Sequence, residues 1–156
     1  MVQKTLAMRF LDGKKVRYEA VTYPVSERDA ETVARHLGVA PAQVFKTLVV
    51  TRERGKPLLV MLPADRQLDL KLLAKEVGEK KLQMATHQEA ERMTRLQVGG
   101  ISALALINRG FAVTIDVAAQ QYEAIYVSAG EKGVNLKVGV ADLVRLTNAK
   151  YVRATS

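Results

Sequence analysis

The chain has 156 residues, 48% hydrophobic and 26% charged, which excludes a disordered, collagen-like or low-complexity protein and suits one domain over residues 1–156. With no cysteine and two histidines, it cannot form disulfides, Cys-ligated zinc, iron–sulfur or His-rich metal sites, so we expect no metal or cofactor. The 24 basic against 16 acidic residues give a formal charge of +8, which favours a polyanionic partner, nucleic acid first. No stretch has the pattern of a signal peptide or a membrane helix, so we expect a soluble, cytoplasmic protein.

The first half of the chain alternates between helical and strand patterns. Helices are expected over residues 5–11, 30–37 and 70–77, and strands over residues 16–23, 44–51 and 58–62. A charged turn containing Gly55 joins the last two strands into a hairpin. Ser26 and Asp29 have the spacing of a capping box before the second helix, and Gly38 and Gly78 suit helix C-caps.

The second half carries another capping-box spacing, Thr86 with Glu89, which predicts a helix through Met93. After a loop-rich stretch, strands are expected over residues 113–116, 124–128 and 135–138, then a helix over 140–146 and an edge strand over 151–153. This order predicts a mixed α/β fold in which helices cover a largely antiparallel or mixed sheet.

Lys46 stands out because it lies between Phe45 and Thr47 inside an apolar strand. A lysine at such a position either points to solvent or is held in a cleft, where loss of hydration lowers its pKa. Strand alternation places it on one face with three aliphatic residues, Val44, Leu48 and Val50. These neighbours favour an enclosed cationic group.

Two loops of small residues are candidates for anion binding. One is Gly99-Gly100-Ile101-Ser102 and the other is Ser128-Ala129-Gly130, with Gly133 shortly after it. Glycines allow backbone N–H groups to approach a ligand closely, as in an anion nest or an oxyanion hole. Plain hairpin turns explain the same composition.

Nucleophilic catalytic sets are not supported by the sequence. There is no Gly-x-Ser-x-Gly elbow, and two ordinary histidines do not argue for a Ser-His-Asp triad. His36 is expected at a helix C-terminus and His87 on the surface. Tyr23, just before Pro24, fits either the core or the wall of a cleft.

Taken in order, several motifs resemble the YbaK family, single-domain proteins similar to the editing domain inserted in bacterial-type prolyl-tRNA synthetase. The resemblance covers nearly the whole chain and is most specific in the Lys-Thr strand, the GGIS loop and the VSAG-x-x-G loop. The matching residues are Thr22-Tyr23, 33–38, 44–48, 67–71, 80–85, 98–102, Ile115-Asp116, 125–130, Lys132-Gly133 and Asp142-Leu143.

The resemblance implies a barrel-like mixed sheet flanked by helices, and trans-editing: hydrolysis of a wrong amino acid from tRNA, typically tRNA(Pro) carrying cysteine or alanine. It implies Lys46 as the central lysine and Gly99 and Gly100 beside the scissile ester. Pocket and substrate-binding positions would be Tyr23, Thr47, Ile101, Ser102, Ser128, Ala129 and Gly130. Mischarged tRNA is then the expected partner at its 3′ acceptor end, with prolyl-tRNA synthetase as a further one.

The chain departs from the family pattern at four places. Ala103 and Ala105 stand where the family has Pro and Gly after GGIS, Asp29-Ala30 replaces an aromatic-Gly pair, and Asn135 replaces a frequent acidic residue. Cysteine is therefore one option among several small or polar amino acids. Two other functions stay open: a non-catalytic module that binds tRNA or a synthetase, and a small-molecule hydrolase or regulator that uses the same cleft.

Overall fold

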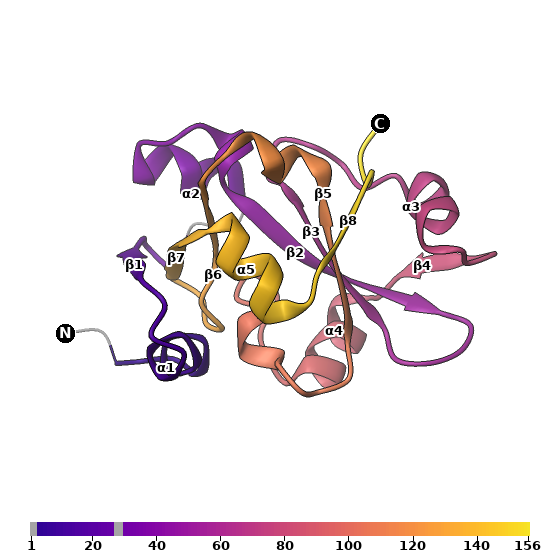
Figure 1. Cartoon of the computed structure of the whole chain (residues 1–156), viewed down its shortest axis with the longest axis horizontal. Coiled ribbons are helices and arrows are strands. Elements are labelled where there is room, and N and C mark those ends of the chain that lie inside the picture. Colours follow the sequence, from indigo (N-terminus) through magenta and orange to yellow (C-terminus); the bar gives the residue numbers. More distant parts are fainter. Residues whose placement is uncertain (1–2, 27–29) are drawn as a thin grey trace.

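The protein has a mixed α/β fold with two β-sheets (Figure 1), seen here in a computed structural model that describes residues 3–26 and 30–156. Its α-helices are α1 (Leu6–Gly13), α2 (Ala30–Leu37), α3 (Leu70–Val77), α4 (His87–Thr94) and α5 (Val140–Thr147). Short 3-10 helices are η1 (Pro41–Gln43), η2 (Leu104–Leu106) and η3 (Val117–Gln121). The strands are β1 (Tyr18–Thr22), β2 (Phe45–Arg52), β3 (Leu58–Pro63), β4 (Leu82–Met84), β5 (Ala112–Asp116), β6 (Ala124–Ser128), β7 (Val134–Gly139) and β8 (Lys150–Val152).

The larger sheet has the strand order β4-β2-β3-β5-β8 and the smaller one β1-β7-β6. The smaller sheet is antiparallel throughout. In the larger sheet β4, β2 and β3 pair antiparallel, whereas β3, β5 and β8 run parallel. An isolated parallel bridge between Val44 and Tyr126 links the two sheets. The predicted class, mixed and largely antiparallel with helices on its faces, is confirmed, but the strands form two sheets instead of one.

The alternation expected along β2 is confirmed by its packing. Phe45 and Val49 are buried in the main hydrophobic core, which includes residues of α1, β5, β6 and β7. Leu48 and Val50, on the opposite face, pack with α3 and β8. All six residues of β3 are buried, because its neighbours β2 and β5 cover both edges and both faces meet core residues.

Local capping signals produced the expected helix ends. In α4, Glu89 N–H donates to Thr86 Oγ1 (3.1 Å) and Thr86 N–H donates to the Glu89 carboxylate (2.9 Å), which completes the capping box. Gly78 ends α3 with a φ of 76°, a left-handed conformation that glycine adopts without steric cost. The capping box expected at Ser26 and Asp29 depends on Asp29, which lies outside the described residues.

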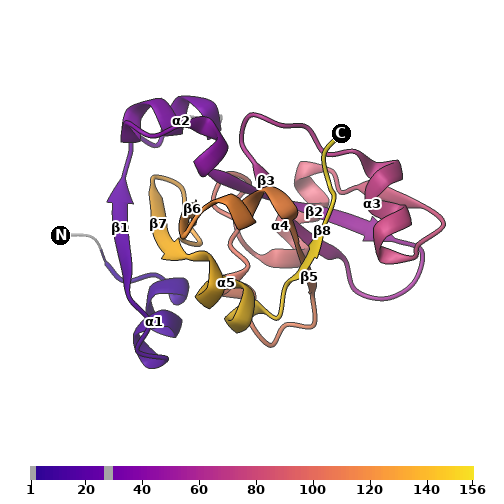
Figure 2. The ribbon, with the colours of Figure 1, turned by 45° about the horizontal axis from the view of Figure 1, so that its top comes forward.

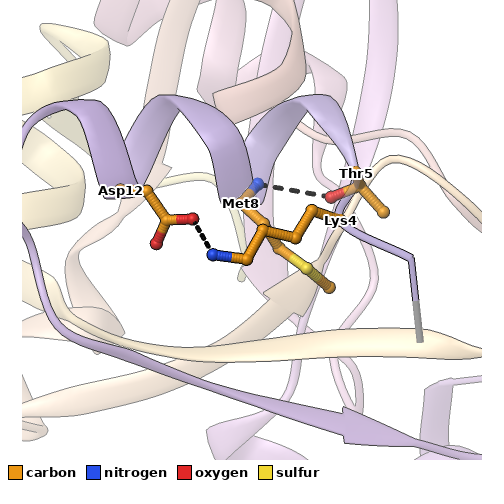
Figure 3. Close-up of polar contacts among 4 residues, drawn as sticks. All are labelled: Lys4, Thr5, Met8 and Asp12. Carbon is orange, nitrogen blue, oxygen red and sulfur yellow. Dashed lines mark hydrogen bonds and ion pairs between the residues drawn. The ribbon is translucent and has the colours of Figure 1, made fainter. Parts of the chain in front are cut away.

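The first helix is held by polar contacts at both of its ends (Figure 3). Thr5 caps α1 by accepting a hydrogen bond from Met8 N–H at 3.3 Å. Lys4 forms an ion pair with Asp12 one helix length further on, and this contact is the main cause that lowers the pKa of Asp12. Because both side chains are exposed, the pair orients the helix entry more than it stabilises the fold.

Two views agree on the arrangement of elements along the longest dimension. The helix α1 and strand β1 lie at one end and α3 lies at the other (Figures 1 and 2), and Figure 1 shows β4 beside α3. The strand β4 was not expected from the sequence, since three residues are too few to show a period. Each α-helix of the described residues has eight residues, well below the ~20 that a bilayer span needs, and none is a membrane span.

Candidate functional site

Lys46 lies at the start of β2, where it pairs with Leu62 of β3. Its side chain is half-buried instead of extending freely into water. Burial lowers the pKa of the Lys46 ammonium, and the negative charges of Glu31 and Asp65 act in the opposite direction. Lys46 is therefore partly enclosed, as expected from the sequence. Three segments set its environment: β2 itself, helix α2, which carries Glu31, and the residues after β3, which include Asp65.

The link between the two sheets places β6 beside the start of β2. The Val44–Tyr126 bridge is parallel, Gln43 Nε2 donates to Ala124 O (3.1 Å), and β2 and β6 are in contact. Both strands run in the same direction from this bridge, so Lys46 and Ser128 each lie two residues beyond it. The end of β6, at Ser128, therefore lies level with the start of β2, at Lys46.

Ser128 in turn contacts the first glycine loop. Its hydroxyl donates to the carbonyl oxygen of Gly99 at 3.3 Å. A Cβ on Gly100 would lie 2.7 Å from the carbonyl carbon of Glu131 and 2.9 Å from the nitrogen of Lys132. The backbones of the two loops are therefore in direct contact, and this approach requires glycine at position 100.

Tyr23 reaches the same loops from the end of β1. Its N–H donates to Gly133 O at 2.9 Å, and its side chain is half-buried. Burial raises the pKa of the Tyr23 phenol. Tyr23 is therefore neither a core aromatic nor a free surface residue, and it borders the loop between β6 and β7.

Thr47 faces away from Lys46 along β2, on the side of Phe45 and Val49. Its hydroxyl oxygen is buried and has no hydrogen-bond partner in the described part of the chain. A buried hydroxyl without a partner costs free energy, typically about 1–3 kcal/mol. Thr47 therefore lies on the core side of β2 and not on the side of Lys46.

The backbone N–H groups of the glycine loop are not equivalent. Gly100 N–H donates to Gln97 O at 2.8 Å and closes a turn, so it is already occupied. Gly99, at a φ of 97°, has no backbone partner for its N–H among the described residues. Both N–H groups were expected to be available to a ligand. Among the described residues, only that of Gly99 has no backbone partner.

Three other expected site residues have buried side chains. Ile101 and Ala129 pack in the main core, and Ser102 accepts a hydrogen bond from Ala105 N–H (3.3 Å) at the start of η2. These residues hold the loops in place, and only their backbone remains for ligand contact. Gly130 has a φ of 102°, and a Cβ placed on it would lie 3.3 Å from the methyl group of Ala105.

Comparison with known proteins identifies the family. The family model described as an aminoacyl-tRNA editing domain matches residues 25–146. The chain belongs to the aminoacyl-tRNA editing domain family. This membership confirms the expected class of enzyme, a hydrolase that acts on aminoacyl-tRNA.

Individual relatives of this editing domain cover it to different extents. An Enterococcus faecalis protein that carries the name Cys-tRNA(Pro)/Cys-tRNA(Cys) deacylase EbsC is 36% identical over 156 residues, 99% of this chain and 94% of that protein. A proline–tRNA ligase of Thermodesulfovibrio yellowstonii is 32% identical over 77 residues, 49% of this chain and 13% of the ligase.

Solved structures show the same fold. The crystal structure of the protein APE2540 has a TM-score of 0.87 at 21% identity and covers 97% of this chain and 99% of its own. A structure described as a trans-editing enzyme for prolyl tRNA synthetase has a TM-score of 0.83 at 23% identity and covers 99% of both chains.

Sequence reasoning missed some residues around the site of this editing domain. A Cβ on Gly99 would lie 3.7 Å from Lys132 Cε, so the Lys132 side chain runs along the glycine loop. Asn135, named from the sequence only as a departure from the family pattern, is buried on β7 directly opposite Ser128. Glu31 and Asp65 carried no local signal, because their effect on Lys46 arises only when α2 and the segment after β3 pack beside β2.

Surface hollows and acidic groups elsewhere in the molecule were compared with the site. Two shallow hollows occur elsewhere, one beside Arg52 and Lys81 and the other beside Arg17 and Lys137. Within residues 3–26 and 30–156, no group of three His, Asp or Glu side chains is placed to hold a metal ion.

Proposed function

We propose that this editing domain acts in trans on mischarged tRNA, with tRNA(Pro) carrying cysteine, alanine or another small amino acid as its substrate. The near-complete match to a protein named for Cys-tRNA(Pro) and Cys-tRNA(Cys) deacylation supports this choice. The partial match to a proline–tRNA ligase supports an association with prolyl-tRNA synthetase. Such editing is needed because a binding site rejects an amino acid that lacks one methylene by only about 1–3 kcal/mol.

The observation that carries the proposal is the half-buried ammonium of Lys46 on β2, two residues beyond the bridge to β6, the strand that leads into one of two loops whose backbones touch. We assign to Lys46 the anchoring of the terminal phosphate or the ester carbonyl of the substrate. A fixed cation in a partly dehydrated site orients a negatively charged substrate more strongly than one in bulk water does. Lys46 has no nucleophilic role in this mechanism.

The reaction needs little beyond orientation and stabilisation of charge. Water adds to the ester carbonyl and gives up a proton, and the tetrahedral oxyanion then collapses with cleavage of the bond between the carbonyl carbon and the ribose oxygen. The ribose oxygen takes up that proton and leaves as the tRNA hydroxyl, and the amino acid is released as a carboxylic acid. The N–H of Gly99, which has no backbone partner in the part of the chain that the structure describes, is the donor we assign to the oxyanion. Gly100 keeps this amide in position through its turn with Gln97 and its contact with Glu131.

The assignment is tested with Lys46→Ala in a deacylation assay on tRNA(Pro) charged separately with Cys, Ala, Ser, Thr and Pro. We expect the rate on the preferred substrate to fall by at least about 100-fold, with a modest loss of tRNA affinity. Lys137→Ala is the matched control, since Lys137 is another half-buried lysine within a strand. A Lys46→Ala protein that deacylates at the wild-type rate would show that the assigned role is wrong.

A non-catalytic tRNA-binding module is the second candidate function, because the chain departs from the family pattern next to the site. Ala105, one of the departures from the family pattern, contacts the loop at Gly130 and so alters the wall beside the site. Purified protein that retards tRNA in a gel but releases none of the five amino acids would favour this second function.

A further inference from the structure

Three connecting segments meet at one end of the larger sheet. Strand pairing places Arg52 opposite Leu82 and Leu58 beside Ala112. The segments that lead into these strand ends are therefore neighbours, namely residues 53–57, 78–81 and 107–111. Figure 1 shows the β2–β3 turn and β4 at the end of the molecule opposite to α1 and β1.

This end of the sheet, here called the basic end, concentrates positive charge. It carries six basic residues, Arg52, Arg54, Lys56, Lys80, Lys81 and Arg109. Its acidic residues are Glu53 and Glu79, so the excess is four positive charges, half of the formal +8 of the whole chain. The three segments therefore form a surface with a local positive excess, which attracts a polyanion.

Two of these cations organise the basic end. Arg52 donates from Nε to Lys56 O (2.7 Å) and lies 3.6 Å from a carboxylate oxygen of Glu79. Lys56 Nζ donates to Arg109 O (2.9 Å) and lies 5.7 Å from the centre of the Phe111 ring. These contacts tie the three segments together, so the surface is formed before any partner arrives.

The other four cations are available to a partner. They are exposed, and none has a side-chain hydrogen bond or an ion pair within the described residues: Arg54, Lys80, Lys81 and Arg109. A shallow hollow lies beside Lys81, lined by the end of β2, the start of β4 and the residues next to them, including Arg52 and Glu53. A concave surface with free cations and few acids suits phosphate groups.

The composition of the basic end favours a double-stranded partner. Single strands are held by aromatic side chains on which bases stack, whereas RNA duplexes are bound through phosphate and ribose contacts. The aromatic residue of these segments is Phe111, which is half-buried beneath Lys56. Cations without a stacking surface fit the backbone of a helix.

The basic end also lies at a definite distance from the proposed reaction site. Lys46 and Arg52 are six residues apart on β2, which corresponds to about 20 Å along an extended strand. A tRNA whose 3′-terminal ester lies at Lys46 continues through its single-stranded end into the acceptor duplex. We propose that the basic end binds the phosphate backbone of this duplex, an inference that rests on the proposed function.

The test is a protein with Arg54→Gln, Lys80→Gln, Lys81→Gln and Arg109→Gln, measured for binding to an uncharged RNA minihelix with a duplex and a single-stranded 3′ end. We expect the affinity to fall at least about tenfold and the slope of log K against log salt concentration to fall by about 3, since four phosphate contacts are lost. Affinity for a single-stranded oligonucleotide of the same 3′ sequence changes by less than about twofold. The kcat of deacylation at saturating tRNA stays at the wild-type value.

The control removes four cations from the opposite end of the molecule, by Lys14→Gln, Lys15→Gln, Arg17→Gln and Lys137→Gln. An equal loss of minihelix affinity in this control, or an equal loss for the single-stranded oligonucleotide, would overturn the proposal. So would unchanged minihelix binding by the first variant, the result expected if the basic end served an acidic protein. Wild-type protein that binds the minihelix through the basic end but hydrolyses no mischarged tRNA would refute the proposed function and leave this surface assigned.

Discussion

At the scale of single residues, the charge of Lys46 depends on neighbours from two other segments. Burial disfavours the ammonium form and lowers its pKa, while Glu31 and Asp65 favour it. The two acids therefore keep Lys46 charged to a higher pH than burial alone would allow. If the ammonium anchors the substrate, activity on the alkaline side should follow this balance.

The substitution Glu31→Gln tests that dependence. Removing the negative charge lowers the pKa of Lys46 further, so Lys46 loses its proton at a lower pH. We expect the alkaline limb of the pH profile of kcat/KM to move to lower pH, with activity near neutral pH retained. Profiles of the wild type, of Glu31→Gln and of Glu53→Gln, an exposed acid in the β2–β3 turn, provide the comparison. If the alkaline limb of Glu31→Gln stays in place or moves to higher pH, the charge of Lys46 does not control the reaction.

At the scale of elements, the site depends on the contact between two loops. One loop precedes η2 and the other joins β6 to β7, and they meet where Gly100 packs on the backbone of Glu131 and Lys132. The hydroxyl of Ser128 adds a hydrogen bond to Gly99 O. The loops are thus positioned by each other as much as by the strands that carry them.

Gly100→Ala should disturb this contact. The added methyl group meets backbone atoms at 2.7–2.9 Å, which cannot move as a flexible side chain does. We expect a loss of about 1–3 kcal/mol in the free energy of unfolding and a loss of deacylation, measured by urea titration and by the tRNA assay.

Gly13→Ala is the matched control for the glycine prediction. A Cβ at Gly13 meets nothing within 4 Å, so we expect stability that is unchanged or raised by up to about 1 kcal/mol. Equal behaviour of the two variants would mean that the loop contact has no structural importance.

At the scale of the whole molecule, the buried carboxylate of Asp116 ties distant parts together. Its two oxygens accept hydrogen bonds from Ala118 N–H (2.9 Å), at the start of η3, and from Ala154 N–H (2.8 Å), beyond β8. Ala154 O in turn accepts from Asp69 N–H (2.8 Å) before α3. One side chain thus connects β5, the C-terminal segment and, through it, α3.

Asp116→Ala removes both acceptors from buried N–H groups. We expect the free energy of unfolding to fall by about 3 kcal/mol or more, measured by urea titration. Asp116→Asn keeps one carbonyl oxygen but points an amide at the other N–H, so it should also destabilise the protein. Asp142→Asn, at an exposed ion pair with Arg145, should change stability by less than about 0.5 kcal/mol. Equal effects at positions 116 and 142 would contradict this account.

Much of the fold could be predicted because its signals are local. The capping box at Thr86 and Glu89, the left-handed Gly78 and the alternation along β2 involve residues within a few positions of each other. The parallel pairing of β3 with β5, the short strand β4 and the division into two sheets could not be predicted, because they depend on long-range packing.

The sequence by itself determined the types of group that the site uses: a lysine within an apolar strand, two glycine loops and no cysteine or triad. Only the tertiary structure decided which of these groups meet. It joined Ser128 to Gly99 and occupied the N–H of Gly100 within a turn. It also buried the Thr47 hydroxyl without a partner among the described residues and brought six basic residues together at one end of the larger sheet. Periodicity and capping act over a few residues, whereas these contacts arise from strand register and from the packing of segments far apart in the chain.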